Sequence, residues 1–495
     1  MFGHRTPSRA ERGESTGNGR DPGDLFHGGP HRSQVLRTRR RAAGWFSVAA
    51  LVVAGASLMP PLGPAALAEA QSAGIRPQAT KVPLPGTPLT SVSLTFDEGS
   101  NDQLAAAAIL DKYGFKGTFF INSGFVGQPG HMTRPDLQKL ADDGHEIGGH
   151  TFSLADLASM DPAEATRQVC NDRTNLTEWG FKATSFSYAF PTVTPEVQAI
   201  VSGCGYNSAR GMGTLATSVD CPGCAAVEPV NPVDPFNTRA TSEVGARWSV
   251  EDLKHSVEAG AAAGGGWVQL VFHGVADDGD PRSVSSEVFE DFARWLAEQT
   301  LEGATFVRTV HEVVGGVAKP AVPGPVPVPA PAGVNALANP GMETPGAWGL
   351  PQCWQMSAYG TNAPNFSTSA EGRNGGAAAQ LDVTGYASGD AKVLPTLDLG
   401  ACSPKALPGH SYDLGAWYTS TQATQFELYY RNSLGAWTYW TASPWYAPAA
   451  DYTEARWHTP PVPADAVAIS FGLNLFADGR LLTDDFFMTD AGVAP

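Results

Sequence analysis

The chain of 495 residues is too long for one hydrophobic core and predicts two folded domains with extra segments. Hydrophobic residues make up 42% and charged residues 16%, which excludes a largely disordered protein. The net charge is −17, but residues 1–70 hold nine Arg against five acidic residues, so the remainder carries −21. Such an acidic body argues against a nucleic-acid partner and favours a neutral partner or simple solubility.

The first 70 residues have the features of a leader and signal peptide. A basic run at residues 37–41 precedes an uncharged apolar stretch from Ala42 to Leu58, and Ala66-Leu67-Ala68 offers a small-x-small cleavage site. We therefore expect a secreted or cell-surface protein. An uncleaved membrane anchor is the alternative interpretation.

Residues 81–318 are predicted to form an α/β domain, because short apolar runs alternate with helix-like segments. The expected strands are 92–96, 117–122, 145–148, 184–188 and 267–273, and the expected helices are 103–113, 135–143, 162–179, 195–202 and 285–298. Their spacing suits a barrel-like parallel sheet.

A Pro-rich linker is predicted at residues 319–334, where six prolines fall between Pro320 and Pro331. Polyproline II geometry makes such a segment a stiff spacer, which we expect to keep two domains apart. Residues 335–495 are rich in Gly, Ser, Thr and aromatic residues, with alternating runs such as Gln425–Tyr430 and Ala466–Leu475. They predict an all-β sandwich.

Six cysteines in an exported chain indicate disulfides. The simplest pairing, one of fifteen, joins Cys170 to Cys204, Cys221 to Cys224, and Cys353 to Cys402. It keeps each bridge within one predicted domain. A redox motif or half a zinc site is the alternative for Cys221-Pro-Gly-Cys224, but no second such pair exists in the sequence.

Three segments of the first domain place titratable side chains where strands end, which is where α/β barrels carry their reactive groups. Asp97 and Glu98 follow the strand 92–96, His150 follows the strand 145–148, and His273 ends the apolar strand 267–273. Each feature alone is a weak signal, because a single histidine or acidic turn is more often structural.

Together these segments resemble the polysaccharide deacetylases of carbohydrate esterase family 4, over about Lys81 to Gly316. The first motif, Thr95 to Gly99, corresponds to the family's Thr-Phe-Asp-Asp-Gly. The resemblance implies a distorted (β/α) barrel that removes acetyl groups from peptidoglycan, chitin-like or other acetylated polysaccharide. It also implies a divalent metal cofactor, zinc in first place, with cobalt or nickel as alternatives.

The resemblance assigns a role to each motif residue. Asp97 would be the general base and His273 the general acid, while Glu98 and His150 would bind the metal. Leu154 occupies the place of the family's second histidine ligand, and leucine cannot bind metal. Asp102 or Asp156 could complete the site, although Asp156 also suits a plain capping role.

The family's arginine that orients the base is also replaced, here by Ser187. Arg210 or Arg239 could substitute for it, and a structural salt bridge is the alternative for either. Tyr188 and Arg210 are predicted to contact the substrate.

The second domain resembles carbohydrate-binding modules with a jelly-roll sandwich, on the short segments 339–343 and 483–487. Sugar rings stack on aromatic side chains, so Trp437, Tyr439 and Trp440 are predicted to bind glycan, the first two on one face of a strand and the third on the other. A structural calcium is predicted at Glu343 and Asp485.

The leading prediction is an exported metal-dependent deacetylase that hydrolyses N-acetyl groups, with O-acetyl groups as an alternative substrate. The competing hypothesis, suggested by Leu154, is a glycan-binding homologue that lacks a complete metal site. A glycan is the expected partner, and the sequence indicates no protein partner.

Overall fold

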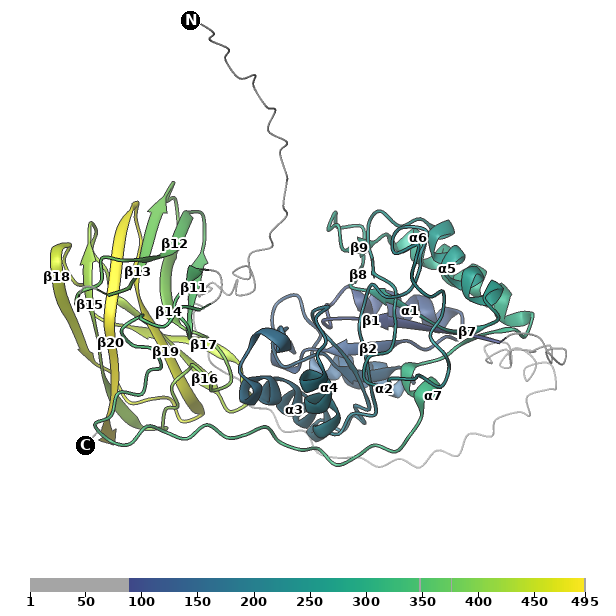
Figure 1. The fold of residues 1–495 in the computed structure, drawn as a ribbon, viewed down its shortest axis with the longest axis horizontal. Coiled ribbons are helices and arrows are strands. Elements are labelled where there is room, and N and C mark those ends of the chain that lie inside the picture. The colour runs from purple at the N-terminus through teal and green to yellow at the C-terminus, as the bar shows by residue number, and fades with distance from the viewer. Residues whose placement is uncertain (1–88, 347–348, 375, 494–495) are drawn as a thin grey trace, which may run out of the picture.

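The computed structural model describes residues 89–346, 349–374 and 376–493. In these ranges the chain forms an α/β domain followed by a β-sandwich, joined by an extended segment (Figure 1). The leader predicted at residues 1–70 lies outside the described residues. Among the described helices, none combines the length and hydropathy needed to cross a bilayer.

The first domain is built on one curved parallel sheet with the strand order β5-β4-β3-β2-β1-β7-β6, and β10 pairs with β1 as well. Its strands are β1 (Thr90–Phe96), β2 (Thr118–Ile121), β3 (Glu146–Gly149), β4 (Ser185–Ser187), β5 (Ser208–Arg210), β6 (Glu243–Val244), β7 (Gly266–Phe272) and β10 (Thr305–Val307). All seven residues of β1 are buried, as expected for a strand covered on both faces. The predicted distorted (β/α) barrel is therefore confirmed.

Helices cover this sheet, and polar residues or prolines at their first turns explain where several of them begin. They are α1 (Gln103–Lys112), α2 (Arg134–Asp142), α3 (Pro162–Glu178), α4 (Pro195–Gly203), α5 (Val250–Ala262), α6 (Ser286–Leu301) and α7 (Val310–Val314), with the short 3-10 turns η2 (Ser123–Phe125) and η3 (Leu157–Ser159). Thr133 and Asp136 form a capping box at α2, and Asp161 caps α3. A small parallel pair, β8 (Gly274–Val275) and β9 (Ser283–Val284), follows β7.

The second domain is a sandwich of two five-stranded antiparallel sheets, which confirms the all-β prediction. One sheet has the order β11-β14-β19-β16-β17 and the other β12-β13-β20-β15-β18. The strands are β11 (Trp354–Tyr359), β12 (Ala363–Ser369), β13 (Ala378–Thr384), β14 (Asp390–Pro395), β15 (His410–Ser420), β16 (Phe426–Asn432), β17 (Trp437–Ala442), β18 (Ala449–His458), β19 (Ala466–Leu475) and β20 (Gly479–Val493). A separate hydrophobic core fills the space between the sheets.

Each domain contains its own disulfides, and all three predicted pairings are present. Cys170 bonds to Cys204 and Cys221 to Cys224 in the first domain, while Cys353 bonds to Cys402 in the second. The described residues contain no free cysteine. A redox or zinc role for Cys221 and Cys224 is not needed to explain them.

The Pro-rich segment does not act as a free spacer, so the prediction that it keeps the domains apart is wrong. Figure 1 shows it running along the underside of the first domain to the sandwich. Buried Arg173 donates hydrogen bonds to the carbonyls of Lys319 and Pro320 at 2.6 and 2.9 Å, and Arg167 donates to Pro325 at 3.0 Å. Pro lacks an N–H but keeps its carbonyl, so buried guanidinium groups can hold such a segment in place.

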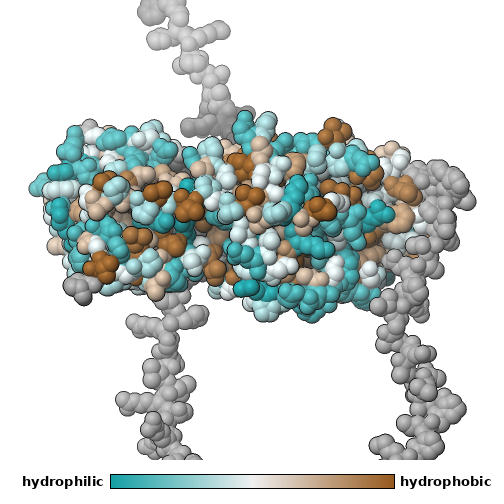
Figure 2. Space-filling model, turned by 90° about the horizontal axis from the view of Figure 1, so that it is seen from below, coloured by the Kyte–Doolittle hydropathy of each residue, from teal (hydrophilic) through white to brown (hydrophobic). Residues whose placement is uncertain are grey.

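The two domains touch directly at two places. The backbone N–H of Leu399 donates to a carboxylate oxygen of Glu164 on α3 at 2.7 Å. Gly435, in the turn between β16 and β17, lies so close to Phe152 that a Cβ at this glycine would fall 2.1 Å from the ring. The face of the molecule seen from below carries hydrophobic residues in small separate groups among polar ones (Figure 2).

Candidate active site

Asp97 lies at the carboxyl end of β1, the central strand of the sheet, and is completely buried. Its Oδ1 pairs with the guanidinium of Arg210 from β5, and Ser187 Oγ at the end of β4 donates to Oδ2 at 3.3 Å. Burial on its own would raise the pKa of Asp97, but the charges of Arg210, His150 and His273 together hold it below its ordinary value. Asp97 is therefore ionised at neutral pH.

His150 follows β3 and is 1% exposed. Its Nδ1 lies 2.8 Å from the carbonyl oxygen of Ser187, which can only accept, so Nδ1 carries the proton and Nε2 keeps a free lone pair. Burial lowers the pKa of His150, although Asp97 and Glu98 act in the opposite direction. A neutral imidazole with a free Nε2 has the form of a metal ligand or hydrogen-bond acceptor.

His273 and Glu98 face each other across the ends of β7 and β1. His273 Nε2 lies 3.6 Å from Glu98 Oε1, and its Nδ1 lies 3.3 Å from Glu243 Oε1 at the start of β6. Arg282 Nη1 donates to Glu98 at 3.1 Å. Glu98 has a left-handed backbone (φ 74°), which turns its side chain away from the line of β1 toward this group.

The residues proposed as metal ligands do not form a complete set. His150 has a suitable free nitrogen, but Glu98 is paired with Arg282 and Asp97 with Arg210. Across residues 89–346, 349–374 and 376–493, no group of three or more His, Cys, Asp or Glu side chains is arranged to hold a metal ion. A three-ligand catalytic site is therefore not assembled by these residues.

Residues 85–209 match the family model described as polysaccharide deacetylase. This segment of the chain is therefore similar to polysaccharide deacetylases. The matched segment includes Asp97, Glu98 and His150, and it ends before Arg210 and His273.

Two curated relatives and one solved structure show how far the similarity extends. A chitin deacetylase from Pestalotiopsis sp is 35% identical over 128 residues, which cover 24% of this chain and 42% of the relative. A gellan lyase from Bacillus sp is 27% identical over 215 residues, covering 41% of this chain and 8% of the relative. A family 4 acetyl xylan esterase from Clostridium thermocellum, solved with a cobalt ion, is 18% identical with a TM-score of 0.32, covering 45% of this chain and 90% of that chain. The chain thus spans less than half the length of these two curated relatives.

Both aspartates proposed to replace the missing ligand are engaged by backbone N–H groups. Asp102 accepts a hydrogen bond from the N–H of Val275 at 2.8 Å and ties the start of α1 to β8. Asp156 accepts a hydrogen bond from the N–H of Ala158 at 3.2 Å and caps η3, which is the alternative, structural role predicted for it. Leu154 is half-buried with φ 55° and supplies no ligand.

Of the two arginines considered as partners of the base, the structure selects Arg210. Arg210 is 1% exposed and meets Asp97, whereas Arg239 is half-exposed and pairs with Glu228 at 3.1 Å. The guanidinium of Arg210, which was also predicted to contact substrate, is enclosed beside Asp97. Tyr188 is 2% exposed, packs in the core and donates to the Phe236 carbonyl at 2.9 Å, so its contact with substrate stays a prediction.

Arg282 and Glu243 also belong to the site, although they were not predicted from the sequence. Arg282 lies in the loop just before β9, and Glu243 begins the two-residue strand β6. Neither segment has a periodic pattern, so no local signal marked them. Only the closeness of β6 and β7 in the sheet brings Glu243 to His273.

The three aromatic residues predicted to bind glycan on β17 alternate between the two faces of the strand, as expected. One of them, Trp440, is not available to a ligand. Tyr439 is 47% exposed, and Trp437 lies 5.9 Å from the guanidinium of Arg431 on the same face. Trp440 packs against the sandwich core, so its predicted role in glycan binding is corrected.

Beside Tyr439, the outer face of the same sheet holds a buried cation that was not predicted. Lys392 is 0% exposed and pairs with Asp390 at 2.7 Å and Glu427 at 2.9 Å. The rings of Tyr359 and Tyr429 lie 5.8 and 5.4 Å from its ammonium group. These residues form a polar and aromatic surface on β11, β14 and β16, next to β17.

Asp390 is expected to make the sandwich less stable as pH rises. Burial raises its pKa from 3.8 to about 7, so the folded state holds the proton more tightly than the unfolded chain. Its contribution is fully present below pH 3.8 and is lost as pH rises to about 7. The melting temperature of Asp390→Asn should fall less over this range than that of the wild type, and equal slopes would contradict the assignment.

The predicted calcium ligands have other partners. Asp485 accepts from Arg373 Nη1 at 2.8 Å and from Asn374 at 3.1 Å, while Glu343 accepts from the N–H of Ala377 at 3.2 Å. The guanidinium already balances the charge of Asp485. We therefore assign no calcium site to these residues.

Proposed function

We propose that the deacetylase domain hydrolyses acetyl groups of a glycan, with Asp97 as general base and His273 as general acid. One observation supports this most strongly: Asp97, His150 and His273 follow three separate strands and meet at one end of the sheet, where Ser187 bonds to both Asp97 and His150 and the paired strands β1 and β7 end immediately before Asp97 and His273. A structural role for three such groups would not require them to meet.

Amide hydrolysis needs two proton transfers, and Asp97 and His273 can each carry out one of them. Water attacks the acetyl carbon and passes a proton to Asp97, whose pairing with Arg210 keeps it ionised. When the carbon–nitrogen bond breaks, the leaving nitrogen takes a proton from His273, whose ring lies 3.6 Å from Glu98 and 3.3 Å from Glu243. No step is assigned to a metal ion, because the ligand set is incomplete.

The sandwich is proposed to bind the same glycan through Tyr439 and Trp437, which raises the local concentration of substrate. We propose that this happens outside the cell. The basic and apolar leader supports that setting, as do the three disulfides, which persist in oxidising compartments.

A second candidate function is glycan binding without hydrolysis. It is favoured by Leu154 at a ligand position, and by the complete burial of Asp97 between Arg210 and Ser187. A buried ion pair can be purely structural. The two candidates differ in one measurable product, acetate.

Replacing Leu154 by histidine separates these candidates. Bound metal and acetate release would be measured on N-acetylated and O-acetylated oligosaccharides, with zinc, cobalt or nickel added. We expect acetate release by the wild type, and a rate about tenfold higher for Leu154→His at limiting metal, because a second imidazole would join His150.

Leu154→Asn is the matched control, since asparagine tolerates the left-handed backbone and is polar but adds no imidazole. It should leave metal content unchanged. Acetate release by the histidine variant alone would establish the second candidate. Release by neither protein would rule out the deacetylase proposal.

A further inference from the structure

A cavity of about 740 Å³ lies between the two domains. One wall is the segment 159–164, which includes Met160 and Glu164 at the start of α3. The opposite wall is β11, with Trp354 and Met356, together with the loop that contains Ala401. The volume falls within the roughly 300–1,000 Å³ that is typical of small-molecule sites.

The position of this cavity relates it to both proposed glycan sites. The chain that leaves His150 passes through η3 directly into the wall of the first domain. β11 and β17, the strand that carries Tyr439, are the two opposite edges of one sheet, and the last residue of β11, Tyr359, lies beside Lys392. The cavity thus lies between the loop that follows His150 and the edge of the sheet opposite to Tyr439.

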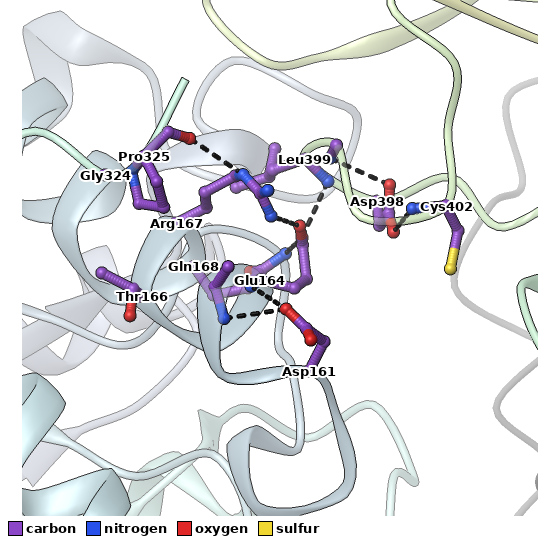
Figure 3. A network of polar contacts seen from close by, with 12 residues as sticks. Asp161, Glu164, Thr166, Arg167, Gln168, Gly324, Pro325, Asp398, Leu399 and Cys402 are labelled. Atoms are coloured by element: carbon purple, nitrogen blue, oxygen red, sulfur yellow. Dashed lines mark hydrogen bonds and ion pairs between the residues drawn. The ribbon is translucent and has the colours of Figure 1, made fainter. Parts of the chain in front are cut away.

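The two walls are held at a fixed separation. Glu164 joins them by accepting from Leu399 of the sandwich at 2.7 Å, and Arg167 donates to the same carboxylate at 2.9 Å (Figure 3). Arg167 also binds the Pro325 carbonyl in the linker, so the paired side chains of Glu164 and Arg167 together connect both domains and the segment between them. Arg431 adds a hydrogen bond to the Asp398 carbonyl at 2.8 Å, which braces the loop carrying Leu399.

The chemistry of the lining fits an uncharged sugar chain. Apolar atoms come from the half-buried Met160 and Met356, while amide and hydroxyl groups come from side chains such as Gln352 and Thr344. Pyranose rings have apolar C–H faces and hydroxyl edges, so both kinds of contact are used.

The charges of the lining exclude one class of glycan. Asp161, Glu164 and Asp398 line the cavity, and none of the described lining residues is Lys, Arg or His. Arg167 balances the charge of Glu164, but a polyanionic glycan would still meet the carboxylates of Asp161 and Asp398 without a lining cation to bind it. Neutral units such as N-acetylated hexosamines avoid this cost.

We propose that this interdomain cavity binds a neutral segment of the same glycan chain whose acetyl groups the deacetylase domain hydrolyses. This inference rests on the proposed function for the identity of the glycan. The cavity makes the sandwich part of an extended substrate site, so affinity increases with chain length once a chain reaches both domains.

Methyl resonances of methionine test the proposal without any catalytic turnover. Met160 and Met356 line opposite walls, and Met160→Leu and Met356→Leu assign their signals in the full chain. The probes are the disaccharide and the hexasaccharide of N-acetylglucosamine. We expect the hexasaccharide to shift both methyl signals and to bind about tenfold more tightly than the disaccharide.

A cavity-filling variant, Ala401→Trp, should weaken hexasaccharide binding about tenfold and leave disaccharide binding unchanged. Ala370→Trp is the control, because Ala370 is exposed on the sandwich and does not line the cavity. Hexasaccharide binding that leaves either methyl unshifted, or no binding at all, overturns the proposal. Methyl shifts without acetate release would contradict the deacetylase function while supporting the cavity as a glycan site, so the two failures are distinguishable.

Discussion

Replacing Arg210 by methionine is expected to lower the free energy of unfolding of the first domain by about 3–5 kcal/mol. The substitution leaves Asp97, which is 0% exposed, as a buried charge without its cation. Methionine has nearly the same length and apolar stem, so the loss reflects the charge rather than a large void. Urea unfolding of the full chain measures the effect.

Arg294→Met serves as the control for this prediction. Its guanidinium is 58% exposed in its ion pair with Asp291, which is 41% exposed, and such pairs contribute about 1 kcal/mol or less. The double variant Asp97→Asn with Arg210→Met should recover part of the stability lost in Arg210→Met. Equal losses for the two single arginine variants would show that Asp97 does not depend on Arg210 for its charge.

Asp97→Asn is expected to reduce acetate release by about 10²–10⁴-fold, the usual contribution of a general base. Asparagine keeps the shape of the side chain and can still accept from Ser187, but it cannot take a proton from water. The rate constant for acetate release, measured at saturating oligosaccharide, reports the loss of the base.

Asp156→Asn is the matched control for the rate. Asp156 caps η3 in the loop that follows His150, so the variant makes the same chemical change near the site without touching Asp97. We expect its rate to stay within about threefold of the wild type, since asparagine also caps helices well. An unchanged rate in Asp97→Asn would place the base elsewhere.

Local sequence features determined much of the fold. Apolar runs predicted β1 and β7, and the helix-like segment 162–179 predicted α3, because these signals act over a few residues of one element. The short strand β5 escaped prediction, since three residues carry no periodic pattern. The sequence also predicted the disulfide pairs, because each bond joins two cysteines of the same domain.

Only the tertiary structure decided how the candidate site is completed. Arg210 lies 113 residues from Asp97 in the chain, and nothing in either local sequence states that β5 and β1 bring them together. The same holds for Glu243 beside His273. Pairings across a sheet depend on strand order, which is a property of the whole domain.

The linker also has one property that the sequence determined and another that only the tertiary structure decided. Its six prolines determined an extended segment, because they fix the backbone angle and remove N–H groups. Whether that segment stands free or lies against the protein depended on Arg167 and Arg173, which α3 presents about 150 residues earlier. The sequence by itself thus determined the elements and the chemistry available at their ends, whereas long-range contacts alone decided which side chains meet.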